Sequence, residues 1–182
     1  KPADQELFLR VSLLNIAVNA YICRSVPEFT MRFMIWLLSH SMYRVEHRNL
    51  QAIPDEGAAL LVCNHVSFVD ALLIGGAVRR PIRFVMCYKI CRLAVLNFIF
   101  RTAGTIPIAG RHEDIQIYEQ AFARIAQYLK DGELVCIFPE GKLTADGEMN
   151  EFRGGVTRIL EETPVPVIPM ALQGVWGRFF SR

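Results

Sequence analysis

Two long apolar stretches open the chain, at residues 7–23 (LFLRVSLLNIAVNAYIC) and 29–45 (FTMRFMIWLLSHSMYRV). Pro27 lies between them and predicts a break between two helices. Each stretch is shorter than the about 20 apolar residues that a spanning helix needs, and each contains an arginine. We therefore expect an amphipathic helical hairpin over residues 1–48 that lies at a membrane interface, with its arginines reaching toward lipid phosphates. The alternative is a hairpin packed on the domain's own core.

After Arg48, short apolar runs alternate with helical patterns. The runs expected to form buried strands are 58–63, 82–86, 105–108, 134–138 and 165–172. Helices are expected over 67–78, 91–100, 115–129 and 154–162. The third is the clearest, because its apolar residues recur at three- and four-residue steps and Gly132 can end it. This alternation predicts an α/β fold with a mostly parallel central sheet flanked by helices, and chemistry at the carboxyl ends of its strands.

The composition adds a membrane surface to this picture. Hydrophobic residues make up 52% of the chain, and the mean hydropathy is +0.26. The five cysteines form no C-x-x-C pair, so we expect reduced, mostly buried thiols, with a cysteine nucleophile as the alternative. The four histidines show no metal-ligand spacing, which predicts no metal site. No signal peptide opens the chain, and its start and end are typical of a piece of a longer protein.

Charge is distributed unevenly, although the net charge is only +2. Between residues 71 and 112 every Asp, Glu, Lys or Arg position is basic: Arg79, Arg80, Arg83, Lys89, Arg92, Arg101 and Arg111. Such a block suits anionic lipid headgroups or an acidic acyl carrier. A plain solvated face is the alternative. No nucleic-acid-binding pattern accompanies the charge, so we expect no nucleic-acid partner.

The segment Asn64-His65-Val66-Ser67-Phe68-Val69-Asp70 follows the first expected strand. Ser67 and Asp70 form a capping box, so a helix that begins at Ser67 lets Asp70 reach back to the imidazole of His65. A His–carboxylate pair is what deprotonation of an alcohol requires, because the carboxylate orients the imidazole and stabilises its charged form. The alternative is a capping box with an incidental histidine.

Two further segments follow strands of the same sheet. Phe138-Pro139-Glu140-Gly141-Lys142 places a carboxylate, a flexible glycine and a cation at the end of the strand 134–138, where they could hold a headgroup or glycerol hydroxyls. Residues 104–111 end in Arg111, which could bind a phosphate through two hydrogen bonds. An ordinary turn with solvated charges is the alternative for both. Hydrolase, phosphate-loop and dinucleotide fingerprints are missing from the sequence.

Together these segments resemble the lysophospholipid and glycerol-phosphate acyltransferases, as in 1-acylglycerol-3-phosphate acyltransferase. Residues 64–70 match the family's N-H-x-S-x-x-D block, and 138–141 match its F-P-E-G block. Residues 104–111 and 165–170 resemble its remaining two blocks. The resemblance implies a catalytic pair, His65 and Asp70, and substrate-binding residues, namely Asn64, Ser67, Arg111, Glu140, Gly141 and Lys142.

The resemblance also implies substrates and a location. Acyl-CoA or acyl-carrier protein would donate the acyl group, a membrane lysophospholipid would accept it, and no cofactor would be needed. Residues 49–182 would form the acyltransferase domain, at the cytoplasmic face of the inner membrane. The acyltransferase domain of bacterial fused lysophospholipid transporters is also similar. Two departures affect the acceptor side: Pro107 replaces an aromatic residue and Arg111 comes one position late, and Lys142-Leu143 replaces Thr-Arg.

Two other functions are compatible with these residues. A non-enzymatic lipid- or membrane-binding module needs only the basic block and the apolar start. A thioesterase would use the same His–Asp pair on water.

Overall fold

The computed structural model describes residues 2–25, 27–92 and 94–177. Its helices are α1 (Pro2–Ser25), α2 (Pro27–Met42), α3 (Asp70–Ala77), α4 (Tyr88–Cys91), α5 (Ala94–Thr102), α6 (Ile115–Lys130) and α7 (Gly155–Glu162). Its strands are β1 (Ala59–Cys63), β2 (Ile82–Cys87), β3 (Ile106–Ile108), β4 (Leu134–Ile137) and β5 (Val167–Met170). A short 3-10 helix, Leu50–Ala52, precedes β1.

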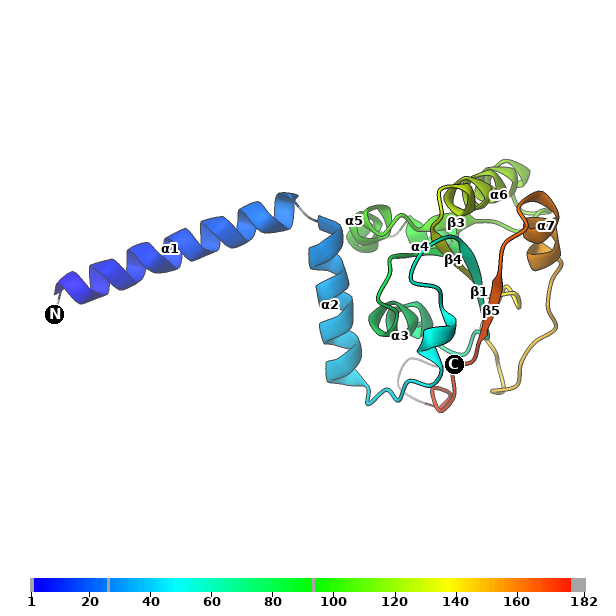
Figure 1. The fold of residues 1–182 in the computed structure, drawn as a ribbon, viewed down its shortest axis with the longest axis horizontal. Coiled ribbons are helices and arrows are strands. Elements are labelled where there is room, and N and C mark those ends of the chain that lie inside the picture. Colours follow the sequence, from blue (N-terminus) through cyan, green and yellow to red (C-terminus); the bar gives the residue numbers. More distant parts are fainter. Residues whose placement is uncertain (1, 26, 93, 178–182) are drawn as a thin grey trace.

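The five strands form one sheet in the order β3-β2-β4-β1-β5, and each neighbouring pair is parallel (Figure 1). The expected α/β fold with a mostly parallel sheet is therefore confirmed. β1 and β4 are adjacent at the centre, with Leu61 opposite Cys136. The carboxyl ends of both strands consequently reach the same edge of the sheet, and this edge carries the two polar segments after Cys63 and Ile137.

Alternate residues of β1 and β4 face two different helical layers. On one face Leu61 and Cys136 pack with Ile74 of α3, and on the other Leu60 packs with Ile125 of α6. A fully buried Leu or Ile stabilises the fold by about 1.5–3 kcal/mol relative to an exposed one. Both faces of the central strands are buried, which is why their sequences are continuous apolar runs without polar alternation.

The expected helix over 67–78 begins later than predicted. The Ser67 hydroxyl accepts a hydrogen bond from the Val69 amide, and the Asp70 amide donates to the Ser67 carbonyl, so Ser67 starts a turn that leads into α3 at Asp70. The expected helix over 91–100 is also different, because the chain forms two helices there, α4 and α5. The remaining strands and helices lie within a few residues of their expected positions.

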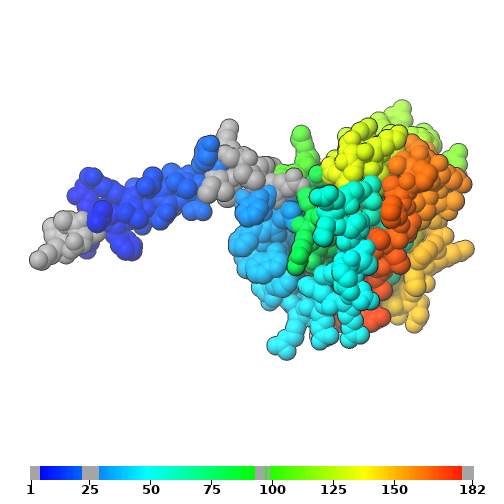
Figure 2. Space-filling model, viewed as in Figure 1, coloured from blue at the N-terminus to red at the C-terminus, as the bar shows by residue number. Residues whose placement is uncertain are grey.

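The N-terminal helices do not form the expected hairpin. Figure 1 shows α1 running away from the domain, while α2 lies along α3. The space-filling view shows α1 as an arm that projects from the body of the molecule (Figure 2). α2 and α3 approach closely because α3 presents a glycine there: a Cβ added at Gly76 would lie 2.2 Å from the Ser39 hydroxyl, and Ser39 is buried. The alternative prediction, packing on the domain's own core, is therefore confirmed for one side of α2.

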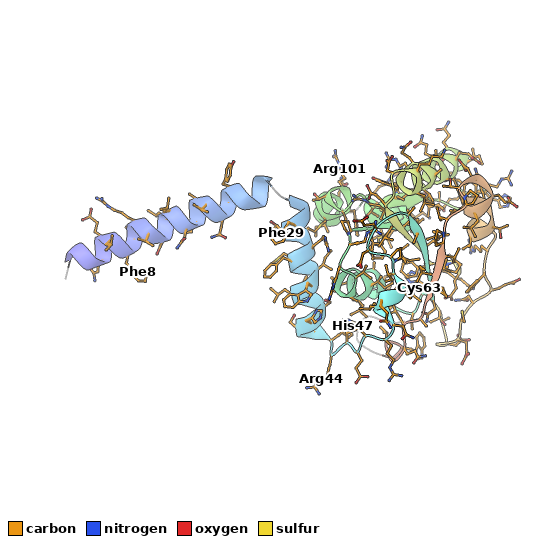
Figure 3. The ribbon with its side chains drawn as sticks, in the orientation of Figure 1. Phe8, Phe29, Arg44, His47, Cys63 and Arg101 are labelled. Atoms are coloured by element: carbon orange, nitrogen blue, oxygen red, sulfur yellow. The ribbon has the colours of Figure 1, made fainter. Side chains whose placement is uncertain are left out.

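Most large apolar side chains of α1 and the outer side of α2 are exposed. Figure 3 shows Phe8 on α1 and Phe29 on α2 directed away from the domain, whereas Cys63 lies inside it. Phe8 is 78% exposed and Trp36 of α2 is 48% exposed. Within the described residues, no helix combines the length and the apolar character needed to cross a membrane.

Candidate active site

His65 and Asp70 meet at the carboxyl end of β1. The His65 Nδ1 lies 2.9 Å from Asp70 Oδ2, and the same oxygen accepts hydrogen bonds from the Val66 and Ser67 amides at 2.7 and 2.9 Å. Asp70 is completely buried, whereas the His65 side chain is 25% exposed. A carboxylate can only accept, so the Nδ1–H donates to Asp70 and the Nε2 lone pair remains available. The expected pairing of these two side chains is therefore present in the fold.

Residues at the end of β4 hold His65 from its other sides. The Phe138 ring stacks on the imidazole, with ring centroids 4.3 Å apart and an interplanar angle of 20°. The His65 amide donates to Glu140 Oε1 at 2.7 Å, and the His65 carbonyl accepts from the Thr144 amide at 3.0 Å. The segment after β4 thus fixes both the backbone and the ring of His65. Residues 64–70 and residues 138–141 therefore form one site.

Glu140 differs from its expected role as a direct ligand of the headgroup. It is only 1% exposed, and its Oε2 accepts from both the backbone amide and the side-chain amide of Asn150, each at 2.8 Å. With Oε1 bonded to His65, both oxygens already have partners within the protein. Buried carboxylates are stabilised by such donors, so Glu140 joins three loops and positions His65.

Asn64 and Ser67 also have structural partners in place of the expected substrate contacts. The Asn64 amide group donates to the Leu172 carbonyl at 3.0 Å and accepts from the Leu172 amide at 2.8 Å. This pairing extends the contact between β1 and β5 beyond the strands. Ser67 is 1% exposed and holds the turn before α3. Both residues therefore shape the loop that carries His65.

Gly141, Lys142 and a residue that the sequence analysis did not single out, Arg153, lie beside Glu140. Gly141 has a φ of +65°, which favours glycine, and the Arg153 side chain lies against it: a Cβ at Gly141 would be 3.0 Å from Arg153 Nε. Lys142 and Arg153 line a shallow pocket together with Glu140. Sequence alone offered one weak signal for Arg153, its position just before a glycine pair that leads into α7.

Arg111 lies at the end of β3, an edge strand that β2 and β4 separate from β1. It is exposed, and together with a hydrogen bond from Arg158 its charge lowers the pKa of Glu119 on α6. In the described chain no hydrogen bond or ion pair joins Arg111 to His65 or Glu140. The structure therefore does not bring Arg111 together with the other expected site residues.

Intramolecular contacts neutralise or occupy much of the predicted basic block. Arg80 donates to the carbonyls of Pro54, Gly57 and Gly132, and so ties together loops at the amino end of the sheet. Lys89 forms an ion pair with Glu113 at 2.5 Å. Arg83 forms an ion pair with Glu133. Three residues of the block thus make structural contacts, whereas other arginines of the block, such as Arg101 (Figure 3), are exposed.

The cysteines divide into two groups. Cys63 and Cys136 are buried free thiols, as expected, but Cys87 is exposed. Burial raises the pKa of Cys63 to about 12, and the nearby Asp70 charge adds to this shift. The pKa of Cys136 is also raised well above its usual value by burial. These two thiols therefore remain protonated at neutral pH, which is the poorly nucleophilic form of cysteine. The side chain of Cys23 lies outside the described side chains.

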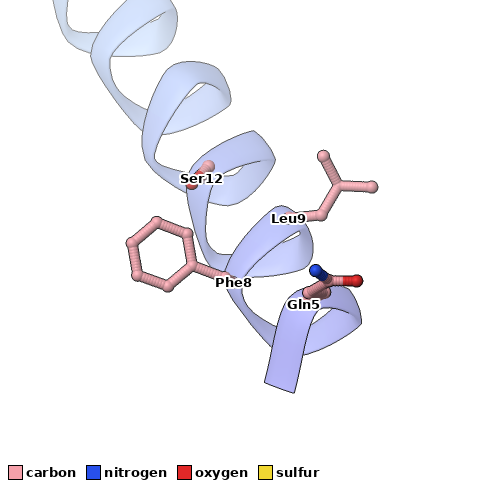
Figure 4. Close-up of a pocket in the computed structure, with 4 residues that line it drawn as sticks. All are labelled: Gln5, Phe8, Leu9 and Ser12. Atoms are coloured by element: carbon pink, nitrogen blue, oxygen red, sulfur yellow. The ribbon is translucent and has the colours of Figure 1, made fainter. Parts of the chain in front are cut away.

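Across residues 2–25, 27–92 and 94–177, no three His, Cys, Asp or Glu side chains come together in a way that could hold a metal ion. A hollow beside α1 is lined by Gln5, Phe8, Leu9 and Ser12, all from that one helix (Figure 4). It belongs to the exposed apolar surface of α1, the helix that runs away from the sheet in Figure 1.

Comparisons with known proteins agree with this architecture. A 1-acyl-sn-glycerol-3-phosphate acyltransferase of Pseudomonas aeruginosa is 31% identical over 150 residues, which cover 81% of this chain and 57% of that protein. A lyso-ornithine lipid O-acyltransferase of the same organism is 30% identical over 113 residues, covering 62% of this chain and 42% of that protein. The crystal structure of the 1-acyl-sn-glycerophosphate acyltransferase PlsC from Thermotoga maritima has a TM-score of 0.67 and 22% identity, covering 87% of this chain and 66% of that chain.

The PlsC structure shares the fold. The chain spans about half the length of the curated relatives it matches. The sequence model described as Acyltransferase matches residues 44–173, which is more than half of the chain and includes both halves of the site around His65. This chain therefore belongs to the acyltransferase family.

Proposed function

We propose that the protein transfers a fatty acyl group from a thioester to the free hydroxyl of a lysophospholipid, with His65 as general base. The observation that carries this proposal is the 2.9 Å contact between His65 Nδ1 and buried Asp70, at a strand end where Glu140 also holds the His65 backbone. A neutral imidazole fixed in this way leaves Nε2 free to accept a proton.

The reaction needs no covalent enzyme intermediate. His65 Nε2 takes the proton from the acceptor hydroxyl while the hydroxyl oxygen attacks the thioester carbonyl carbon. The tetrahedral intermediate collapses with cleavage of the C–S bond, and the thiolate takes the proton from the imidazolium. Asp70 keeps the imidazole oriented throughout, and stabilises its positive charge. General-base assistance of this kind contributes about 10²–10⁴ in rate.

The substrates are proposed from the site and from the names of relatives. The donor is acyl-CoA or an acyl-carrier protein. The acceptor is a lysophospholipid such as 1-acyl-glycerol-3-phosphate or lysophosphatidylethanolamine, in line with the relative from Pseudomonas aeruginosa that is named for the first of these. Lys142 beside the site would contact the headgroup, and Gly141 would leave room for it.

The exposed apolar surfaces of α1 and α2 would lie in the interface of the membrane that supplies the acceptor. Leu9 and Leu13 of α1 are 60% and 57% exposed, and Arg10 lies between them. Helices of this kind bind at the boundary of headgroups and acyl chains, with arginines directed to phosphates. The protein would then act at the cytoplasmic face of the inner membrane, either peripherally or as part of an anchored fusion.

An acyl-transfer assay tests the proposal. The protein is incubated with lysophospholipid vesicles and a radiolabelled acyl thioester, either acyl-CoA or acyl-carrier protein, and labelled diacyl lipid is measured. We expect His65→Ala to lower the rate by at least about a hundredfold. His112→Ala is the matched control, because His112 is exposed after β3, and it should retain full activity. Near-full activity of the His65→Ala variant would contradict the mechanism.

Product analysis separates the two alternative functions. Free fatty acid released without any lysolipid present would identify a thioesterase. Vesicle binding without thioester consumption under any acceptor would identify a non-enzymatic binding module.

A further inference from the structure

A shallow pocket next to the proposed catalytic pair contains an arginine that the acyl-transfer step does not use. It is lined by Glu140, Lys142, Glu151, Phe152 and Arg153. Its inner side is the buried carboxylate of Glu140, whose Oε1 accepts from the His65 amide at 2.7 Å. The pocket therefore adjoins the backbone of His65 through Glu140.

The backbone of Arg153 is fixed at this pocket. Its amide donates to the Pro139 carbonyl at 2.9 Å, which joins it to the loop after β4. Its side chain lies against Gly141, whose missing Cβ leaves the room that the guanidinium group occupies. The hydrogen bond to Pro139 thus holds the Arg153 backbone, and the Arg153 side chain lies against Gly141.

The guanidinium group of Arg153 takes part in no hydrogen bond or ion pair among the residues that the structure describes, and the residue is exposed. Arg158, five positions further along, instead forms an ion pair with Glu119 and lies over the Phe122 ring. An arginine that is held in place by its backbone but has a free guanidinium is available to a ligand.

The other candidate for an anion contact, Arg111, is located elsewhere. Its charge acts on Glu119, and β2 and β4 separate its strand from β1. Lys142 and Arg153 are instead the two cations of the pocket beside Glu140. The chain has Lys142-Leu143 after Gly141, so an arginine from a later loop can supply the planar cation at this position.

We infer that Arg153, together with Lys142, binds the phosphate group of the acceptor headgroup. This inference rests on the proposed acyl transfer and adds the acceptor contact to it. A guanidinium group can donate two parallel hydrogen bonds to phosphate oxygens, while Lys142 adds a point charge. Arg153 is then a specificity-determining residue that favours phosphate-containing acceptors over neutral ones.

The experiment compares two acceptors that present the same glycerol hydroxyl, 1-acyl-glycerol-3-phosphate and the phosphate-free monoacylglycerol. Arg153→Met keeps the apolar stem and removes the charge. For the phosphate acceptor we expect its KM to rise about tenfold or more with little change in kcat, since hydrogen bonds to charged groups are strong. For monoacylglycerol we expect a change within about twofold. Arg153→Lys should recover part of the loss, because it restores the charge but not the paired hydrogen bonds.

Two controls accompany these variants. Arg124→Met removes an exposed arginine of α6 and should behave as the unsubstituted protein with both acceptors. The melting temperature of each variant checks that the fold is retained.

Two results would overturn the inference. One is an equal loss with both acceptors in Arg153→Met. Another is a phosphate-selective loss in Arg111→Met that is absent from Arg153→Met. If the unsubstituted protein acylates neither acceptor nor any other lysolipid, the proposed function itself fails, and that result is distinct from a missing phosphate selectivity in an active enzyme.

Discussion

The site at the end of β1 and the N-terminal helices differ in the surroundings of their side chains. Around His65, the buried carboxylates of Asp70 and Glu140 accept their hydrogen bonds from the chain itself. Along α1, large apolar side chains such as Phe8 and Leu14 are more than half exposed. The first region makes most of its hydrogen bonds within the protein, although Asp70 Oδ1 is buried and has no partner among the described residues. The second region leaves its apolar side chains exposed.

This difference predicts that substitutions in the two regions affect different properties of the protein. Buried polar groups with internal partners are rigid, because leaving any of them unpaired costs free energy. Exposed apolar helices gain free energy only when another surface removes them from water. Changes at the first region should therefore alter catalysis and stability, while changes at α1 should alter only binding to membranes.

The largest effect is expected from Asp70→Asn. An asparagine keeps the size of the side chain but weakens the acceptor that orients the His65 imidazole, so acyl transfer should fall by about 10³-fold. The measurement is the rate at saturating substrates. Asp55→Asn, on an exposed loop before β1, is the control and should leave the rate unchanged. More than about a tenth of the activity remaining in Asp70→Asn would contradict the role of the pair.

The next largest effect concerns membrane binding. Leu9, Leu13 and Ile16 lie at helical spacing on α1, and each is more than half exposed. Replacing all three by Ser should raise the dissociation constant for anionic vesicles by about a hundredfold or more, since each buried apolar side chain contributes about 1.5–3 kcal/mol.

The melting temperature of this triple variant should not change, because these side chains make no core contacts. Asn15→Gln with Asn19→Gln on the same helix is the matched control and should bind vesicles as the unsubstituted protein does. A large drop in melting temperature, or unchanged vesicle binding, would show that α1 is covered by protein instead.

A smaller effect is expected on stability from Glu140→Ala. The substitution leaves the His65 amide and both Asn150 groups without their acceptor, so the free energy of unfolding should fall by about 3 kcal/mol. Chemical denaturation measures this change. Glu151→Ala is the control, because Glu151 is exposed and has no partner among the described residues, and its effect should stay within about 0.5 kcal/mol. Equal effects of the two variants would show that the hydrogen bonds of Glu140 to His65 and Asn150 do not stabilise the fold.

The smallest effect is expected at the contact between α2 and α3. Gly76→Ala introduces a Cβ 2.2 Å from the Ser39 hydroxyl and should lower the free energy of unfolding by about 1–3 kcal/mol. Combining it with Ser39→Gly removes the clash and should recover part of this loss. Gly154→Ala, where nothing lies within 4 Å of the added atom, is the control. The absence of any recovery in the double variant would show that this contact does not determine the packing of α2.

Local patterns predicted the parts of the molecule that depend on neighbouring residues. The pairing of His65 with Asp70 followed from a capping box, because both residues belong to one turn. The parallel sheet followed from apolar runs such as Leu60–Val62 that alternate with helical patterns. The exposed apolar helices followed from arginine and asparagine within apolar stretches.

Only the tertiary structure decided the rest, since it depends on loops that are distant in sequence. Glu140 became a positioning residue because Asn150 and His65 donate to it, and no local pattern reveals which donors will surround a carboxylate. Arg111 lies apart from the site because β3 is at the edge of the sheet, and strand order is not encoded in the apolar periodicity. Arg153 lies at the pocket because the loop before α7 folds back beside Glu140. The sequence by itself therefore determined the pairing of His65 with Asp70 at the end of β1, while strand order and loop packing determined which charges lie near it.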